Sequence, residues 1–143
     1  IVDLIESENP KFGTNKIFKV KSHDEYLKVK EAARFASIAL KEAVRLSTIC
    51  DNGHDLDLEL TKFIIGQDVY PSGVGFMGFP KSVCISPNDV LIHGIPNKRK
   101  FNEGDWMNLD VTVFKNGYFG DNSTMVQLGD VDKEVKRMVK SVD

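Results

Sequence analysis

Between residues 22 and 51, apolar residues recur every three or four positions, which is the period of one face of a helix. These apolar positions are Val29, Ala32, Ala33, Ala36, Ala39, Leu40, Ala43, Val44 and Leu46. Ser22 followed three residues later by Glu25 is the pattern of a capping box, which marks a helix start. We therefore expect a long amphipathic helix from Ser22 to about residues 48–51, with its charged residues in solvent.

Two shorter segments also have helical patterns. Asn52-Gly53 predicts a turn or helix stop, and Asp55 is the expected N-cap of a second helix that ends at Gly66. Asp130 is the expected N-cap of a third helix. The apolar face of this third helix comprises Val131, Val135, Met138, Val139 and Val142.

The stretch between the second and third helices has the texture of strands and turns. Glycines and prolines interrupt short β-prone runs at 82–86 and 89–93. Residues 106–114 and 118–128 read as two longer strands, joined by Asn116-Gly117, a strong hairpin signal. Helices and strands are segregated along the chain, so the predicted fold class is α+β.

The predicted hairpin brings two carboxylates together. With a two-residue turn at Asn116-Gly117, Thr112 faces Asp121 and Asp110 faces Ser123. Asp110 and Asp121 are then diagonal neighbours on one face, with Cα atoms roughly 7–8 Å apart. Two carboxylates at that spacing can converge on metal ions about 3.5–4 Å apart, as in two-metal hydrolytic sites. A β-bulge would shift this register and separate the pair.

The plain alternative is that Asp110 is a solvent-facing strand residue and Asp121 belongs to an ordinary turn region. Against this reading, Asp is depleted in strands and Asp110 interrupts an apolar run. A buried carboxylate is costly unless it is paired or bound to a metal. His93, just before Gly94, is either a structural residue or a group that contacts substrate or metal. Cys84 is most simply a small buried hydrophobe.

Composition narrows the classes of function. The chain has 143 residues, of which 19 are Lys or Arg and 21 are Asp or Glu, so its formal net charge is −2. This charge argues against a basic nucleic-acid-binding segment. No apolar run approaches the roughly 20 residues of a membrane span. Two cysteines outside any CxxC pattern fit a reducing compartment. Residues 1–21 lack a periodic pattern and read as an extension or linker.

Beyond these patterns, the runs GFPKSVCIS, HGIP, GDWMNLDVT and NGYFGD follow one another in an order that closely resembles the type I methionine aminopeptidases. The resemblance extends back to the helix at Ser22, about four-fifths of the chain. It implies the pita-bread fold and removal of the initiator methionine from nascent chains by a dinuclear metal centre. Residues 22–143 would be the N-terminal part of that catalytic domain, truncated at the C-terminus.

The resemblance also assigns roles to residues. It implies that Asp110 and Asp121 are metal ligands and that His93 is the catalytic histidine that contacts substrate near the scissile bond. Phe79 and Cys84 match residues that line the pocket for the Met side chain. Phe76 would add another wall of that pocket, while Gly73 has no side chain where some relatives place one.

The family completes its metal centre with one histidine and two glutamates downstream of the hairpin, and with a second substrate-contacting histidine. After Asp121 this sequence has no histidine and only four carboxylates, Asp130, Asp132, Glu134 and Asp143. We therefore expect the parent protein to be the enzyme and this chain alone to be inactive. The two metal ions implied are cobalt, manganese, iron or zinc, because such sites accept several divalent ions.

Two alternatives stay open. One is a non-catalytic pita-bread module that binds peptides or ribosome-associated partners, and the other is a related proline-directed metallopeptidase. The implied partners are nascent polypeptides beginning with Met and the ribosome, with no nucleic acid binding by this segment, no membrane and a monomeric full-length protein. The expected compartment is the cytoplasm, with an organellar form as the alternative.

Overall fold

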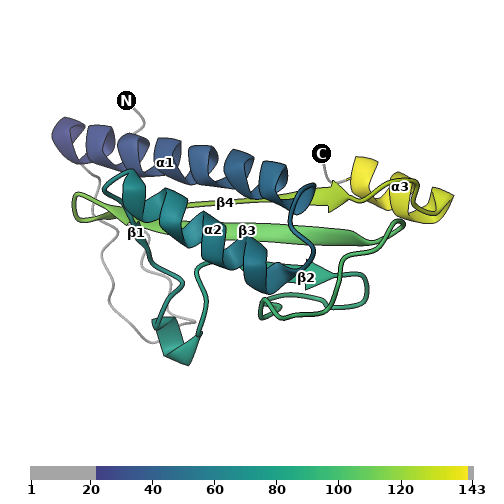
Figure 1. Cartoon of the computed structure of the whole chain (residues 1–143). Coiled ribbons are helices and arrows are strands. Elements are labelled where there is room, and N and C mark those ends of the chain that lie inside the picture. The colour runs from purple at the N-terminus through teal and green to yellow at the C-terminus, as the bar shows by residue number, and fades with distance from the viewer. Residues whose placement is uncertain (1–21, 142–143) are drawn as a thin grey trace, which may run out of the picture.

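The computed structural model describes residues 22–141, so the extension predicted for residues 1–21 and the predicted apolar residue Val142 lie outside the described part. Within residues 22–141, three α-helices and four strands form an α+β fold, as predicted (Figure 1). The elements are α1 (His23–Ser47), α2 (Gly53–Gly66), β1 (Tyr70–Pro71), the 3₁₀ turn η2 (Phe76–Gly78), β2 (Cys84–Pro87), β3 (Trp106–Lys115), β4 (Tyr118–Gln127) and α3 (Lys133–Lys140).

Strand β3 organises an antiparallel sheet. β4 pairs with the whole of β3, while β1 and β2 pair with separate parts of it, around Val113 and around Leu109. Since β4 occupies one edge of β3 throughout, β1 and β2 share the other edge. The hairpin register is the predicted one, with Thr112 opposite Asp121 and no bulge between β3 and β4.

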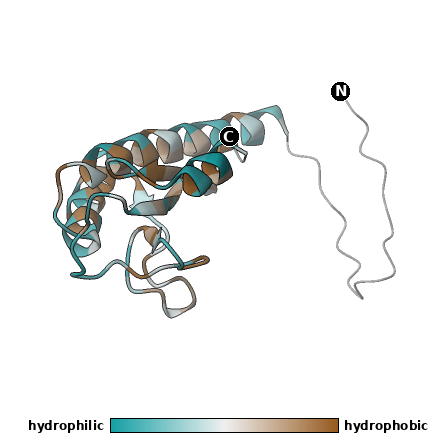
Figure 2. Cartoon of the chain, turned by 90° about the vertical axis from the view of Figure 1, so that its right-hand side faces the viewer, coloured by the Kyte–Doolittle hydropathy of each residue, from teal (hydrophilic) through white to brown (hydrophobic). Residues whose placement is uncertain are grey.

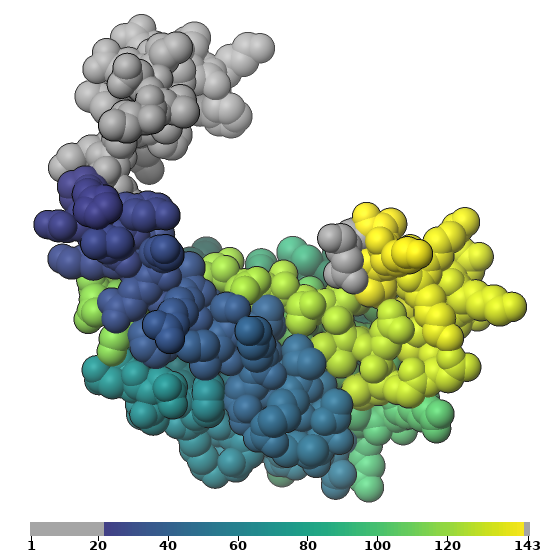
Figure 3. All heavy atoms as spheres, turned by 90° about the horizontal axis from the view of Figure 1, so that it is seen from above, coloured from purple at the N-terminus to yellow at the C-terminus, as the bar shows by residue number. Residues whose placement is uncertain are grey.

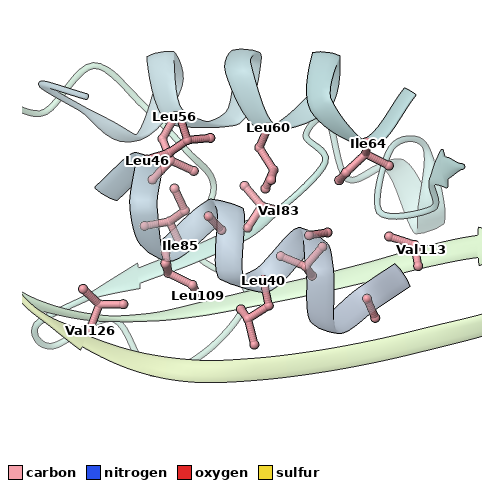
Figure 4. Close-up of a cluster of buried hydrophobic side chains, with 14 of the residues drawn as sticks. Leu40, Leu46, Leu56, Leu60, Ile64, Val83, Ile85, Leu109, Val113 and Val126 are labelled. Atoms are coloured by element: carbon pink, nitrogen blue, oxygen red, sulfur yellow. The ribbon is translucent and has the colours of Figure 1, made fainter. Parts of the chain in front are cut away.

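The core lies between one face of this sheet and the helices α1 and α2 (Figure 4). Leu109, Val111 and Val113 of β3, which alternate along the strand with Asp110 and Thr112, are fully buried there. Full burial of each such side chain contributes roughly 1.5–3 kcal/mol to stability. The buried stripe of α1 is rich in alanine, which lets the helix lie close to β4. Figure 3, seen from above, shows α1 running across the molecule toward α3.

The capping box of the first helix is confirmed, because Ser22 Oγ accepts from Glu25 N and Ser22 N donates to Glu25 Oε2. The other two predicted helix starts were wrong by a few residues. Asn52 caps α2 by accepting from the N–H of Asp55, so Asn52-Gly53 begins a helix instead of a turn. Asp132 caps α3 in the same way by accepting from Glu134 N.

The strand predicted at residues 89–93 is also wrong, and that segment forms an irregular loop. Asn88 and His93 bound it with φ of 53° each, in the left-handed region, which breaks the extended conformation of a strand. Its apolar residue Leu91 is 88% exposed, so it has no sheet or core to pack on. The pair Tyr70–Pro71 forms a short strand that the sequence did not predict.

The loops that carry η2 and residues 88–100 lie on the side of the sheet away from α1 (Figures 1 and 2). The helices cover the face of the sheet on which Leu109, Val111 and Val113 are buried. Because side chains alternate along a strand, Asp110 and Thr112 point to the opposite face. Among residues 22–141, no helix is long and apolar enough to span a bilayer.

Candidate metal site

Asp110 and Asp121 come from the two long strands of the hairpin and share its uncovered face. Asp110 pairs with Ser123, and Asp121 pairs with Thr112 two positions along, so the carboxylates are diagonal neighbours as predicted. Asp110 is half-buried, whereas Asp121 is exposed. Because both residues lie within long paired strands, their Cα positions are fixed by the hydrogen bonds of the sheet.

The carboxylates of Asp110 and Asp121 are close enough to interact electrostatically. Burial raises the pKa of Asp110, and the negative charge of the neighbouring Asp121 raises it further. Thr112 Oγ1 donates a hydrogen bond of 2.8 Å to Asp121 Oδ1, which fixes that carboxylate. Two adjacent carboxylates that repel each other present several oxygen ligands to a cation, whose charge would offset the repulsion.

Cys84 of β2 lies directly opposite Asp110 on the neighbouring strand, so it shares the same face. Burial raises the pKa of its thiol to about 11, with further contributions from the Asp110 and Asp121 charges. Such a thiol stays protonated and is a poor nucleophile, because the thiolate is the reactive form. The side chain of Cys84 is half-buried, so it is less buried than the small buried hydrophobe that the sequence predicted.

His93 lies in the loop that follows β2 and is exposed. A positive charge on His93 lowers the pKa of Asp110, against the stronger effects that raise it, so the imidazole is near enough to act on that carboxyl group. In the part of the chain that the structure describes, no hydrogen bond holds the imidazole. His93 is thus available to a ligand at the rim of the acidic pair.

Of the two predicted pocket phenylalanines, Phe79 is half-buried and Phe76, in η2, is 69% exposed. Phe76 is therefore largely uncovered by residues 22–141. At Gly73 an added Cβ would lie 3.1 Å from the backbone oxygen of Lys81, so a side chain there would need small shifts of its neighbours.

A buried polar cluster holds the segment that leads into β2. Ser82 donates from both its N–H and its Oγ to Asp57 Oδ1 of α2, at 2.7 Å each. Lys81 Nζ lies 3.2 Å from Asp57 Oδ2 and 3.0 Å from Nδ1 of His54, which must accept because the ammonium only donates. These contacts fix the chain two residues before Cys84. His54, in the first turn of α2, is itself half-buried.

The sequence assigned no role to two hydroxyl groups near the pair, those of Thr112 and Ser72. Thr112 was placed opposite Asp121 by the predicted register, and that pairing was the available signal for its hydrogen bond. Ser72 follows β1 and donates from its N–H to Thr112 O at 3.1 Å. Its Oγ is buried without a hydrogen-bond partner within residues 22–141. No sequence pattern predicts the burial of the Ser72 hydroxyl, because β1 is only two residues long.

The donor set fits a divalent cation only in part. Asp110 and Asp121 supply oxygen ligands of the kind that divalent ions accept. Across residues 22–141, however, no three His, Cys, Asp or Glu side chains come together in a group that could hold a metal ion. The hairpin thus offers two carboxylates, and any further protein ligands come from outside the described residues.

Comparison with known proteins identifies the family to which this chain belongs. The sequence profile of metallopeptidase family M24 matches residues 28–143, well over half of the chain. The chain belongs to metallopeptidase family M24. The matched region covers most of α1, the hairpin and α3, so the candidate site lies inside it.

Within the M24 family, the chain resembles the methionine aminopeptidases, as its motifs predicted. It is 41% identical over 122 residues to mouse "Methionine aminopeptidase 1D, mitochondrial", covering 85% of this chain and 36% of the relative. It is 38% identical over 123 residues to Arabidopsis thaliana "Methionine aminopeptidase 1B, chloroplastic", covering 86% and 33%. The crystal structure of methionine aminopeptidase from Rickettsia prowazekii superposes with a TM-score of 0.80 at 32% identity, covering 85% and 49%.

The α+β, pita-bread assignment is confirmed by this superposition. The chain spans about a third of the length of the two curated relatives and about half of the Rickettsia structure. The M24 family is one of metal-dependent peptidases, which agrees with a hairpin that presents two carboxylates.

Proposed function

We propose that this chain is the part of a methionine aminopeptidase that carries the Asp110–Asp121 half of a dinuclear metal centre. The reaction would be metal-dependent hydrolysis of the peptide bond after an N-terminal methionine. The observation that carries the proposal is the side-by-side placement of the two carboxylates on a paired hairpin, next to His93.

In this proposal each residue has a separate task. Asp110 and Asp121 would hold the metal ions, with Thr112 orienting Asp121 through its 2.8 Å hydrogen bond. The bound metals would supply a nucleophilic water and polarise the substrate carbonyl. His93 would contact the substrate beside the scissile bond. Phe79 and Cys84, with Phe76, would surround the methionine side chain, whose thioether suits soft apolar contacts.

Two carboxylates can bind a divalent ion weakly, but they are too few to build a catalytic metal centre, since catalytic zinc sites use three protein ligands. We therefore expect the 143-residue chain alone to release no methionine from a Met-Ala-Ser peptide with added Co²⁺ or Mn²⁺. Release of methionine that disappears in Asp110→Asn would show that the chain completes the site by itself.

The activity itself can be tested in a chimera in which residues 22–141 replace the matching half of the Rickettsia relative. We expect it to cleave Met-Ala-Ser, and Asp110→Asn or Asp121→Asn to abolish cleavage. A panel of X-Pro peptides separates the proline-directed alternative, which predicts the opposite preference. A folded chimera that cleaves neither class would favour the non-catalytic peptide- or ribosome-binding module.

The finer assignments follow from the same proposal. The substrates would be nascent chains that begin with Met, and the ribosome would be the place where the protein meets them. Cobalt, manganese, iron or zinc would serve as the metal, because oxygen and nitrogen ligands bind all four. We propose a cytoplasmic, monomeric full-length protein, with the mitochondrial and chloroplastic names of the two relatives as the reason to test organellar fractions as well.

A further inference from the structure

The backbone at His93 is held in an unusual conformation. Its φ of 53° lies in the left-handed region, which is unfavourable for a residue with a Cβ. Such a conformation persists only where the surrounding structure determines it, and it recurs at functional sites. The exposed imidazole makes no hydrogen bond within residues 22–141, so whatever fixes His93 must act through its main chain.

The contacts that could fix it lie at the next residue. Gly94 O accepts a hydrogen bond of 2.9 Å from Ile85 N of β2. Gly94 N donates one of 3.1 Å to Ser86 Oγ. A Cβ added at Gly94 would lie 2.0 Å from Ile85 O, so the peptide sits directly against the strand and only glycine fits. Both polar groups of Gly94 are therefore bound to β2.

Ser86 is placed to connect this loop with the acidic pair. It is 3% exposed and lies two residues after Cys84, so the two side chains share a face of β2. That is the face of Asp110, which pairs with Cys84. The Ser86 hydroxyl thus joins the sheet that carries the carboxylates to the loop that carries His93.

We propose that Ser86 is a positioning residue of the candidate site, and that its hydroxyl holds the Gly94 peptide so that His93 stays at the rim of the Asp110–Asp121 pair. The role of His93 toward substrate rests on the proposed function. The positioning of His93 by Ser86 does not, and it can be measured on the chain without metal or substrate.

The test compares three substitutions in the isotope-labelled chain. Ser86→Ala removes the acceptor and Ser86→Thr keeps it. Ser82→Ala removes a different buried serine hydroxyl, one that binds Asp57 instead of the His93 loop. In Ser86→Ala we expect hydrogen exchange of the Gly94 amide to accelerate about tenfold, and the backbone couplings of His93 to move toward those of negative φ. Ser86→Thr and Ser82→Ala should leave both near their wild-type values.

Unchanged exchange and couplings in Ser86→Ala, or equal changes in Ser82→Ala, would overturn the proposal. The matching serine substitutions in the Rickettsia chimera add a functional readout, in which Ser86→Ala should lower kcat about tenfold or more with little change in KM. Altered couplings with unchanged kcat would overturn the role of Ser86 in the site. An inactive parent chimera would count against the proposed function alone, because the exchange and coupling data decide the positioning independently.

Discussion

Thr112 and Asp121 face each other across the β3–β4 hairpin, and the threonine hydroxyl donates a 2.8 Å hydrogen bond to Asp121 Oδ1. The bond leaves the other carboxylate oxygen available and fixes the direction in which Asp121 points. A metal ligand that is oriented in advance loses less conformational freedom when it binds, so Thr112 should strengthen metal binding.

We expect Thr112→Val to weaken Mn²⁺ binding by the chain about three- to tenfold without loss of fold, because valine keeps the β-branched shape. The matched control is Thr124→Val, which removes a hydroxyl from the same hairpin away from Asp121. Calorimetric titration of both variants checks this. Equal affinities for Thr112→Val and the wild-type chain would contradict it.

The close packing of α1 on β4 gives a second prediction. A Cβ at Gly120 would lie 2.2 Å from the backbone oxygen of Ala32, and neither strand nor helix backbone can move away cheaply. We expect Gly120→Ala to lower the free energy of unfolding by about 3 kcal/mol or more. Gly66→Ala is the control, since its Cβ would meet nothing within 4 Å and alanine favours a helix. Urea unfolding that ranks the two variants equally would show that the contact is absent.

Asp105 gives a pH-dependent prediction. Hydrogen bonding to Arg99, with further bonds from Asn88 and the backbone of Asn102, lowers the pKa of this buried carboxyl to about 2. Its pKa in the unfolded chain is about 3.9, so the ionised carboxylate stabilises the folded state by about 2.5 kcal/mol above pH 4. That stabilisation should be lost as the pH falls from about 4 to about 2.

Urea unfolding of Asp105→Asn at several pH values checks this. The variant should be less stable than the wild-type chain at pH 7, and the difference should shrink as the pH falls toward 2. Asp51→Asn, at an exposed position, is the control. A difference that stays constant between pH 7 and pH 2 would contradict the role of the Asp105 carboxylate.

The buried Asp57 side chain gives a fourth prediction. Its removal in Asp57→Ala would leave the N–H of Ser82 without its 2.7 Å acceptor and Lys81 without its ion partner. We expect a loss of about 3 kcal/mol in unfolding free energy, as for other buried charge networks that lose one member. Asp55→Ala, on the exposed side of the same helix, should cost less. Similar losses in the two variants would argue against a special role for Asp57.

The sequence predicted the parts of this fold that depend on local periodicity. The capping box at Ser22 and the hairpin register around Asn116-Gly117 are set by neighbouring residues, and both were right. Asn52 and Asp132 compete with nearby Asp55 and Asp130 as helix caps, and the pattern alone does not choose between two good capping residues. The strand predicted at 89–93 failed because Asn88 is held by hydrogen bonds with Asp105 and Trp106, while the Gly94 peptide after His93 is bound to β2.

Only part of the candidate site could be predicted from the pattern of the sequence alone. Asp110 and Asp121 came from the register, while the roles of His93, Phe79 and Cys84 came from the resemblance to a family. The Ser86–Gly94 hydrogen bond joins a hydroxyl and a peptide N–H that are eight positions apart in the sequence. No periodic pattern of residues predicts such a bond. Tertiary contacts of this kind are found only once the chain is folded.

The measurement that tests the central claim most directly is the broadening of the amide NMR signals of the isotope-labelled chain when small amounts of Mn²⁺ are added. The unpaired electrons of Mn²⁺ broaden the signals of nearby amides. The account predicts that the amides of Asp110, Thr112 and Asp121 broaden first, and that the double variant Asp110→Asn/Asp121→Asn abolishes this selectivity. The same pattern of broadening in the double variant, or broadening centred on another part of the chain, would contradict a metal site at the hairpin.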